Sequence, residues 1–383
     1  MQVNKIIYIG VNDREIDLFE SQYVVPNGVS YNSYLINDEK TVLMDCVDLR
    51  KFDQWLINLS QALNGRELDY IVCLHMEPDH SGSLKRVMEI YPNAKIIGNA
   101  STFKMMNNFF DFDIEDKKII VKDNDVISFG EMSLRFVFTP MIHWPEVMMA
   151  YESVSRTLFS ADAFGKFGAL DEDEDWACEA RRYYFNIVGK YGVQVQNALS
   201  KLSGLCIENI CPLHGPVLTE NLEYYLGKYQ IWSSYQPEDN GVTIACASIH
   251  GNTLKACKML KELLEDKGVK VSLFDLNRSD LSEVLEDAFR YDKLVLACCT
   301  YDMGIFPVME DFLNHLKAKN YQNRSVALIE NGSWAPQAKK IMLDYICNMK
   351  NINVLENNIT INSGIKEETI ISLKKLVEEL AKV

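Results

Sequence analysis

Four side chains that can bind metals occur within the six residues HMEPDH. His75, Glu77, Asp79 and His80 follow the apolar run DYIVCL and precede SGSLKRVMEIY, which has the pattern of a helix, so they lie at a strand-to-helix turn. Groups that need solvation are costly to pack at one turn unless a cation compensates their charge. The cluster therefore predicts a metal site and not a purely structural turn.

Three more candidate ligands each follow a strand-like run. His143 comes after LRFVFTPMI, Asp162 after TLFSA and His214 after IENICPL. A single histidine after a strand is usually structural, but strand ends on one edge of a sheet can converge. Four imidazoles and three carboxylates are too many for one tetrahedral ion. They suit two ions that share a carboxylate, and Asp162 is the natural bridge.

The ligand types favour iron. Imidazole binds zinc, iron and copper alike, whereas carboxylates without thiolates shift the preference toward harder, redox-active ions. Three carboxylates and one bridging hydroxide would balance the charge of two ferrous ions, so the reduced site could be neutral in a dry pocket.

A second constellation lies where a strand near Ala247 opens directly into a helix. Backbone N–H groups, hydroxyls and the helix N-terminus can hold a phosphate there. The loop has no lysine, so it is not the P-loop of nucleotide triphosphatases. Two later loops carry aromatic residues that could flank an isoalloxazine ring. The candidate FMN-binding residues are Ser248, Ile249, His250, Gly251, Asn252, Thr253, Thr300, Tyr301, Asp302, Met303, Gly304, Asn331, Gly332, Ser333 and Trp334.

Strands and helices alternate regularly after Gly241. The strands are expected at 242–248, 269–276, 293–299, 325–330 and 352–361, and the helices near 254–267, 280–290, 307–318, 335–348 and 367–381. Five βα units imply a doubly wound parallel sheet of the size of a flavodoxin-like module. In a 2-1-3-4-5 sheet, strands one, three and four border the crevice where FMN binds.

The first 240 residues have a different pattern. Hairpin-like pairs such as VSYNSYLINDEKTVLMDCV are interrupted by helices, which indicates a mixed sheet or two sheets flanked by helices. The change near YQIWSSYQPEDNG predicts two domains, 1–240 and 241–383. Of the two histidines outside the metal set, His315 is expected to be structural, and His250 is a candidate contact of the flavin phosphate.

Composition restricts the location and the partners. The amino terminus lacks the pattern of a signal peptide, and no run reaches the about 18 apolar residues of a membrane span. Ten cysteines without a CxxC pair indicate reduced thiols in the cytoplasm and argue against a rubredoxin-type iron site. A net charge of −15 argues against nucleic acid or an anionic membrane as partner.

The order HxExDH, His, Asp, His resembles the metallo-β-lactamase fold, in which zinc hydrolases usually show HxHxDH. Glu77 stands where those hydrolases have their second histidine. With the flavodoxin-like continuation, the chain resembles the flavodiiron proteins, or A-type flavoproteins, over essentially its whole length. The resemblance implies an αββα domain (α+β) followed by a flavodoxin-like α/β domain. It also implies one iron held by His75, Glu77 and His143, another by Asp79, His80 and His214, and Asp162 as the bridge.

The resemblance further implies an oxidoreductase that reduces dioxygen to water, nitric oxide to nitrous oxide, or both. Electrons would pass through FMN from an external donor such as rubredoxin, since none of the chain resembles a donor domain. A head-to-tail homodimer or dimer of dimers is expected, because the short linker at 225–241 keeps the flavin crevice from swinging onto the metal edge of its own chain. Two alternatives remain open: a zinc-dependent metallo-hydrolase with an accessory flavodoxin domain, and a non-enzymatic electron carrier.

Overall fold

The computed structural model describes residues 5–382 and divides the chain into two compact units. The first unit comprises Met1–Tyr183 and Val193–Gln230, and the second comprises Tyr184–Gly192 and Ile231–Val383. The division into independent domains at residue 240 stays a prediction. The short segment Tyr184–Gly192 interrupts the first unit along the chain and packs within the second.

The first unit contains two larger sheets. One has the order β1 (Ile6–Tyr8), β6 (Tyr34–Asn37), β7 (Thr41–Met44), β8 (Tyr70–Val72), β9 (Lys95–Gly98) and β10 (Lys118–Ile120). The other has the order β11 (Val126–Ser128), β12 (Ser133–Phe138), β13 (Met148–Glu152), β14 (Thr157–Phe159) and β15 (Asn209–Cys211). Both sheets mix parallel and antiparallel pairs. Short ribbons pair β2 (Val11–Asp13) with β5 (Val29–Tyr31), and β3 (Leu18–Phe19) with β4 (Tyr23–Val24).

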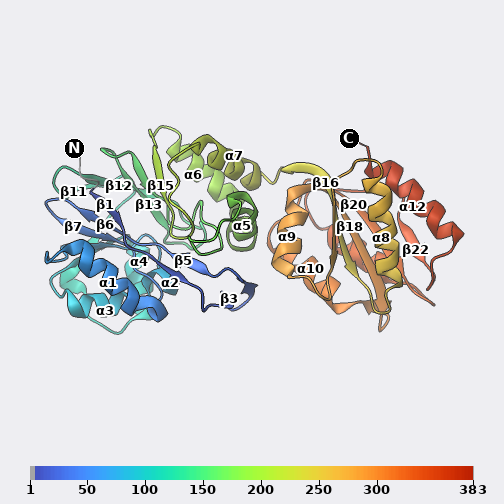
Figure 1. The fold of residues 1–383 in the computed structure, drawn as a ribbon, viewed down its shortest axis with the longest axis horizontal. Coiled ribbons are helices and arrows are strands. Elements are labelled where there is room, and N and C mark those ends of the chain that lie inside the picture. The colour runs from blue at the N-terminus through green and yellow to red at the C-terminus, as the bar shows by residue number, and fades with distance from the viewer. Residues whose placement is uncertain (1–4, 383) are drawn as a thin grey trace. The chain divides into compact units, whose positions relative to one another are not determined.

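The core of this unit lies between the two sheets. Ile36 of β6, Phe136 of β12 and Phe159 of β14 belong to one buried cluster, so the inner faces interdigitate. Helix α1 (Phe52–Leu63) buries Phe52, Trp55, Leu59 and Leu63, a spacing of three or four residues that places them on one helix face. Figure 1 shows α1, α3 (Leu84–Ile90) and α4 (Ala100–Phe109) outside the first sheet and α5 (Trp176–Tyr183), α6 (Gly192–Leu202) and α7 (Leu222–Ser233) outside the second. The expected αββα arrangement is confirmed.

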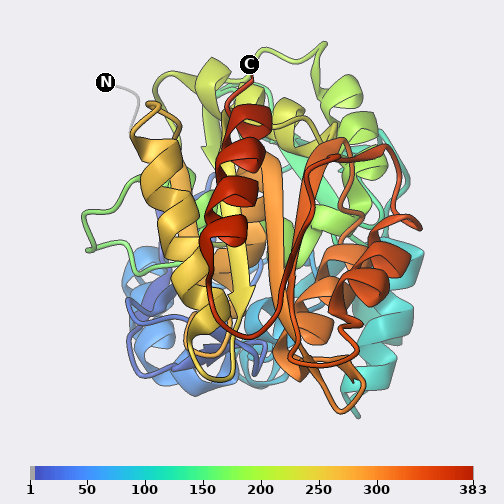
Figure 2. The same ribbon diagram turned by 90° about the vertical axis from the view of Figure 1, so that its right-hand side faces the viewer.

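The second unit has a parallel sheet in the order β17 (Val271–Asp275), β16 (Asp239–Ala247), β18 (Tyr291–Tyr301), β20 (Arg324–Asn331) and β21 (Ile352–Val354). This is the expected 2-1-3-4-5 order. Helices α8 (Asn252–Glu265) and α12 (Glu367–Leu380) lie side by side on one face (Figure 2), and α9 (Leu281–Arg290) and α10 (Pro307–Ala318) cover the other (Figure 1). The flavodoxin-like fold is therefore confirmed.

One predicted strand of this sheet is divided. The expected strand 352–361 is two short strands, β21 and β22 (Ile359–Ile361), which both pair with β20. Between them, the side chain of Asn358 accepts the hydrogen bond of the Leu328 N–H at 2.7 Å, so a side chain replaces a strand carbonyl there. Helix α11 (Ala338–Ile346) precedes β21.

The segment Tyr184–Gly192 is an integral part of the second unit. Phe185 stacks on Phe289 of α9 with ring centroids 4.2 Å apart, and the Asn186 side chain donates to the Ser282 carbonyl at 3.1 Å. None of the helices in the described part of the chain is long and apolar enough to cross a membrane.

Candidate metal centre and flavin pocket

Strand ends and the turns that follow them carry all seven candidate ligands. His75 follows β8, Asp162 follows β14 and His214 follows β15, while His143 lies in the loop between β12 and β13. The short helix α2 (Pro78–Ser81) begins after Glu77 and carries Asp79 and His80. The first unit brings these side chains together as two adjacent groups.

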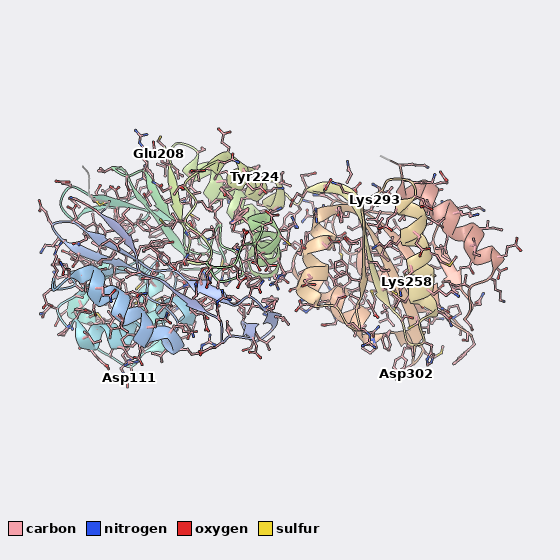
Figure 3. The ribbon with its side chains drawn as sticks, in the orientation of Figure 1. Asp111, Glu208, Tyr224, Lys258, Lys293 and Asp302 are labelled. Atoms are coloured by element: carbon pink, nitrogen blue, oxygen red, sulfur yellow. The ribbon has the colours of Figure 1, made fainter. Side chains whose placement is uncertain are left out.

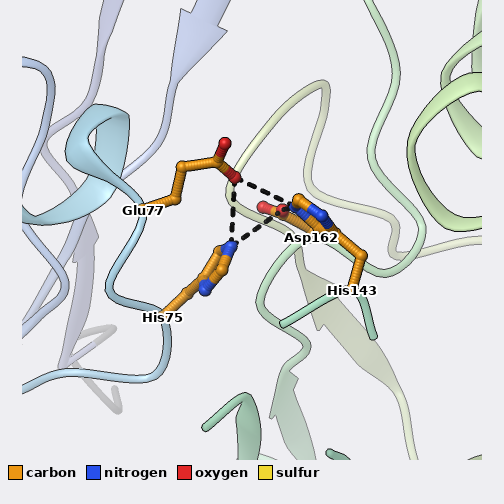
Figure 4. A group of neighbouring side chains, drawn as sticks. All are labelled: His75, Glu77, His143 and Asp162. Carbon is orange, nitrogen blue, oxygen red and sulfur yellow. Dashed lines mark hydrogen bonds and ion pairs between the residues drawn. The ribbon is translucent and has the colours of Figure 1, made fainter. Parts of the chain in front are cut away.

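The first group contains His75, Glu77, His143 and Asp162, and their side chains face one another (Figure 4). The Nε2 atom of His143 lies 2.9 Å from Glu77 Oε2 and 3.1 Å from Asp162 Oδ2. The Nε2 atom of His75 lies 3.2 Å and 3.5 Å from the same two oxygens. Imidazole nitrogens and carboxylate oxygens thus surround one point, as a single cation requires.

The second group contains Asp79, His80 and His214. Asp79 Oδ2 lies 3.3 Å from His80 Nε2 and 3.2 Å from His214 Nε2. The other oxygen of Asp162, Oδ1, lies 3.0 Å from His80 Nε2 and 3.9 Å from His214 Nε2. Asp162 therefore presents one oxygen to each group, which is the geometry of a bridging carboxylate.

Charges within the site stabilise one another. Burial lowers the pKa of His143, but the neighbouring carboxylates of Asp162 and Glu77 outweigh it and raise this pKa to about 9. Burial raises the pKa of Asp162, but the positive charges of His80 and His75 outweigh it and hold that pKa well below its usual value. The raised pKa values of His75, His80 and His143 favour a proton on each imidazole, where a metal ion would replace it.

Several buried atoms of the site lack hydrogen bonds. Both oxygens of Asp79 and of Asp162, and Nε2 of His80 and His214, have no well-formed hydrogen bond within residues 5–382. Such atoms are uncommon in folded proteins and call for a ligand. Two cations would satisfy all of them, so the residues fit a pair of metal ions.

Two further residues at the centre escaped the sequence analysis. Tyr183, in α5, is buried with its ring centroid 5.5 Å from that of His214, and its hydroxyl has no partner in the described chain. Burial raises the pKa of Tyr183 well above its usual value, and the nearby charges of Asp162 and Asp79 raise it further. Glu146 accepts a hydrogen bond from His75 Nδ1 at 2.8 Å. From the sequence, Glu146 could have been recognised by its position three residues after His143. Nothing in the sequence of α5 distinguishes Tyr183 from its neighbours.

A cavity of about 590 Å³ opens beside Glu77 and Asp79. The tight turn between β3 and β4 contributes Glu20, and burial together with the charge of Glu77 raises the pKa of Glu20 to about 7. On another side of the cavity, Arg50 donates a hydrogen bond to the Tyr31 hydroxyl at 3.0 Å. Small molecules can therefore approach the ligand groups from solvent.

The second unit has a pocket of about 400 Å³ at the carboxyl edge of its sheet. Figure 3 shows Lys293 near the start of β18 and Asp302 just beyond its end, which locates this edge. Twelve of the expected flavin residues line the pocket: Ile249, His250, Asn252, Thr253, Thr300, Tyr301, Asp302, Met303, Asn331, Gly332, Ser333 and Trp334. Cys299 and Ser363 line it as well and were not expected.

Three expected residues, Ser248, Gly251 and Gly304, are not part of the pocket lining. Ser248 instead supports the loop, because its hydroxyl accepts the Gly251 N–H at 3.1 Å. Gly251 has φ +82°, a left-handed conformation that favours glycine, and no side chain caps the helix α8 that follows. The free N–H groups at this helix start fit a phosphate.

The two remaining histidines lie in the second unit. His250 lines the pocket, in the loop that precedes α8. His315 lies in α10 with Nε2 3.6 Å from Asp311 one helical turn earlier, which agrees with a structural role.

Comparisons with known proteins agree with this architecture. The family model "ODP family beta lactamase" matches residues 29–215. The anaerobic nitric oxide reductase flavorubredoxin of Klebsiella pneumoniae is 30% identical over 346 residues, covering 87% of this chain and 71% of the relative. The rubredoxin-oxygen oxidoreductase of Megalodesulfovibrio gigas is 27% identical over 365 residues, covering 91% and 90%.

A solved structure shows the same fold over both units. A mutant of the flavo di-iron protein from Thermotoga maritima superposes with a TM-score of 0.89 at 25% sequence identity, covering 98% of this chain and 95% of the other. An identity of 30% with the Klebsiella relative, over 71% of that protein's length, is enough to assign the family. The chain therefore belongs to the flavodiiron proteins, a family of oxidoreductases.

Proposed function

We propose that this protein reduces dioxygen to water, nitric oxide to nitrous oxide, or both, at a pair of non-haem irons with electrons that pass through FMN. The observation that carries the proposal is the shared carboxylate Asp162, with one oxygen 3.1 Å from His143 and the other 3.0 Å from His80. When bound, FMN supplies two-electron uptake with one-electron release, and two ferrous ions supply a site that binds and reduces a diatomic gas.

The residue roles follow from this geometry. His75, Glu77 and His143 hold one iron, Asp79, His80 and His214 hold the other, and Asp162 bridges them. The residues that line the 400 Å³ pocket hold the FMN, with its phosphate at the start of α8. His250 lies in that loop and contacts the phosphate.

The electron donor is proposed to be a separate protein such as rubredoxin, which the name of one relative includes. We also propose that the chain pairs head to tail with a second copy, as a homodimer or a dimer of dimers, so that the flavin of one copy serves the irons of the other. The rim of the flavin pocket supports this pairing, because Trp334 and Met303 are 77% and 60% exposed. Exposed large apolar side chains gathered around a pocket are typical of an interface. Ten free thiols agree with a cytoplasmic location.

The rival function is zinc-dependent hydrolysis with the second unit as an accessory. Glu77 argues against this hydrolase function, because a carboxylate at the position where zinc hydrolases have a histidine favours iron. Colour and elemental analysis discriminate between the two. The proposed enzyme is yellow and contains about two irons per chain, whereas a colourless zinc protein would support the hydrolase.

The decisive test is an anaerobic comparison of both gases. Purified protein is given chemically reduced rubredoxin and then either dioxygen or nitric oxide, and gas consumption is followed with an electrode. Fast consumption of at least one gas supports the proposal, and the ratio of the two rates gives the preference. Protein that holds FMN and two irons but consumes neither gas would instead be an electron carrier.

A further inference from the structure

The outer nitrogens of the site imidazoles have unequal partners. His75 Nδ1 contacts the carboxylate of Glu146 at 2.8 Å. His214 Nδ1 contacts the Ser30 backbone carbonyl at 2.7 Å, a neutral acceptor. His80 Nδ1 has no hydrogen-bond partner in the described part of the chain. A buried carboxylate is thus hydrogen-bonded to one metal group, through His75. Asp45, the buried carboxylate whose charge acts on His80 of the other group, makes no hydrogen bond to that imidazole within the described residues.

The carboxylate of Glu146 is fixed in place. Its side chain is fully buried, and the oxygen that faces His75 also accepts the Met76 N–H at 2.8 Å. The backbone carbonyl of Glu146 accepts the Asn99 side chain at 2.6 Å, and Asn99 caps the start of α4. Neither the backbone nor the carboxylate is therefore free to turn away from His75.

A carboxylate in this position has two effects on the imidazole. It accepts the Nδ1 proton, so the lone pair of His75 lies on Nε2, the nitrogen that faces Glu77 and Asp162. It also makes the imidazole a stronger electron donor, as carboxylates that contact metal-bound histidines generally do. A backbone carbonyl fixes the tautomer of His214 in the same way but adds no charge.

We propose that Glu146 is a positioning residue that makes the two metal subsites unequal, so that the subsite of His75, Glu77 and His143 binds its iron more tightly and is oxidised more readily. This inference rests on the proposed di-iron function and deepens it. The order in which the two irons give up electrons is then set by a buried carboxylate outside the seven ligands.

The chain offers a matched control in Glu152, which is also fully buried. Its carboxylate accepts the N–H groups of Val154 and Ser155 at 2.9 and 2.6 Å, and the Ser155 hydroxyl at 2.6 Å. None of these partners is a candidate ligand. Glu152→Gln therefore removes a buried carboxyl group from the same unit without changing a contact of a candidate metal-binding histidine.

The experiment compares wild type, Glu146→Gln and Glu152→Gln as full-length protein loaded with FMN and ferrous iron. Iron affinity is measured by competition with a chelator, and the oxidation of each iron is followed by Mössbauer spectroscopy during a redox titration. In Glu146→Gln, we expect an affinity loss of about 10- to 100-fold at one of the two sites and a higher potential for that iron. The flavin potential of Glu146→Gln should match that of wild type. The iron affinities and iron potentials of Glu152→Gln should match those of wild type as well.

Unchanged affinities and potentials in Glu146→Gln would overturn the inference, and so would equal losses in both variants. If Glu146→Gln does not fold, the wild-type protein loaded with zinc gives the answer by nuclear magnetic resonance. A protonated Nδ1 of His75, with its proton further downfield than that of His214, is expected, and an unprotonated His75 Nδ1 would overturn the inference. Wild type that fails to bind two irons would instead refute the proposed function.

Discussion

The phenol of Tyr183 is tilted by 54° against the imidazole of His214, with the two ring centroids 5.5 Å apart. Its hydroxyl has no hydrogen-bond partner within residues 5–382, although Asp162, Asp79 and Glu77 are all close enough to influence it. A buried donor without a partner in the described chain, beside a candidate metal-binding cluster, is suited to contact a molecule bound there.

Tyr183→Phe should therefore keep both irons and FMN but slow gas reduction. A hydrogen bond to a charged group contributes about 1.5–3 kcal/mol, so the rate should fall roughly 10- to 150-fold. The measurement is steady-state gas consumption alongside iron and flavin content. Tyr321→Phe is the matched control, because Tyr321 is equally buried and its hydroxyl also has no partner in the described chain, yet it lies in the second unit. Equal rates in wild type and Tyr183→Phe would exclude a role for this hydroxyl.

His214→Asn should leave the fold and the yellow colour intact but remove at least one iron and all gas reduction. His214 lies in the first unit, and the residues of the flavin pocket lie in the second. Iron is counted by elemental analysis, and flavin by its absorbance. His315→Asn makes the same substitution at a histidine of the second unit and should retain both irons. Full iron content and activity in His214→Asn would mean that the ligand assignment is wrong.

Glu77→His should shift metal preference toward zinc, because it replaces a carboxylate by an imidazole at the centre of the first group. The substitution also removes the oxygen that lies 2.9 Å from His143 Nε2. Wild type and variant are expressed with iron and zinc both available, and their metal contents are compared. An unchanged ratio of iron to zinc would show that this carboxylate does not govern selection.

If electrons pass from the flavin of one chain to the irons of another, two inactive variants should complement each other. His214→Asn should lack at least one iron. A Ser248→Asp, Thr253→Asp double variant should lack FMN, because Thr253 lines the pocket and new carboxylates repel the phosphate. Co-expressed, they should recover roughly a quarter of wild-type activity, since about half of the dimers are mixed and each holds one competent pair. No recovery in verified mixed dimers would place the whole transfer within one chain.

Cys299 should react with alkylating agents in a manner that depends on pH near neutrality. A hydrogen bond with the Cys298 thiol lowers the pKa of Cys299 to about 7 despite partial burial, and the Ile249 N–H adds to the effect. Only the thiolate is nucleophilic, so in FMN-free protein the alkylation rate should rise from pH 6 and level off above pH 8, within about one unit of this pKa. Peptide mass spectrometry follows the site, and FMN should protect it because Cys299 lines the pocket. A rate that continues to rise beyond pH 9 would contradict the lowered pKa.

The gathering of the seven candidate ligands could be predicted because they lie at or shortly after the ends of apolar runs. Residues such as His75 and His214 are marked by their position along the chain, and the fold then brings strand ends together. The same reasoning located Thr300 and Asn331, which lie at the carboxyl ends of β18 and β20.

Residues whose role depends on packing could not be found in this way. Tyr183 contacts His214 from within a helix, and Ser363 reaches the flavin pocket from the loop after β22, a strand that sequence reasoning had joined to β21. Asn358 interrupts that strand because its side chain bonds to the backbone of β20, and such a contact across strands leaves no periodic pattern in the sequence.

The packing of Phe185 on Phe289 has a consequence for how this gene can be cut and recombined. A coding fragment that begins at Gly241 would encode nearly all of the sheet of the second unit but not Phe185, the aromatic ring that covers Phe289 of α9. Its product would expose an apolar surface that the intact chain keeps dry, and it would tend to aggregate. A single crossover at residue 240 would separate two rings that fold as neighbours, so a fragment that carries the second unit intact must also encode Tyr184–Gly192.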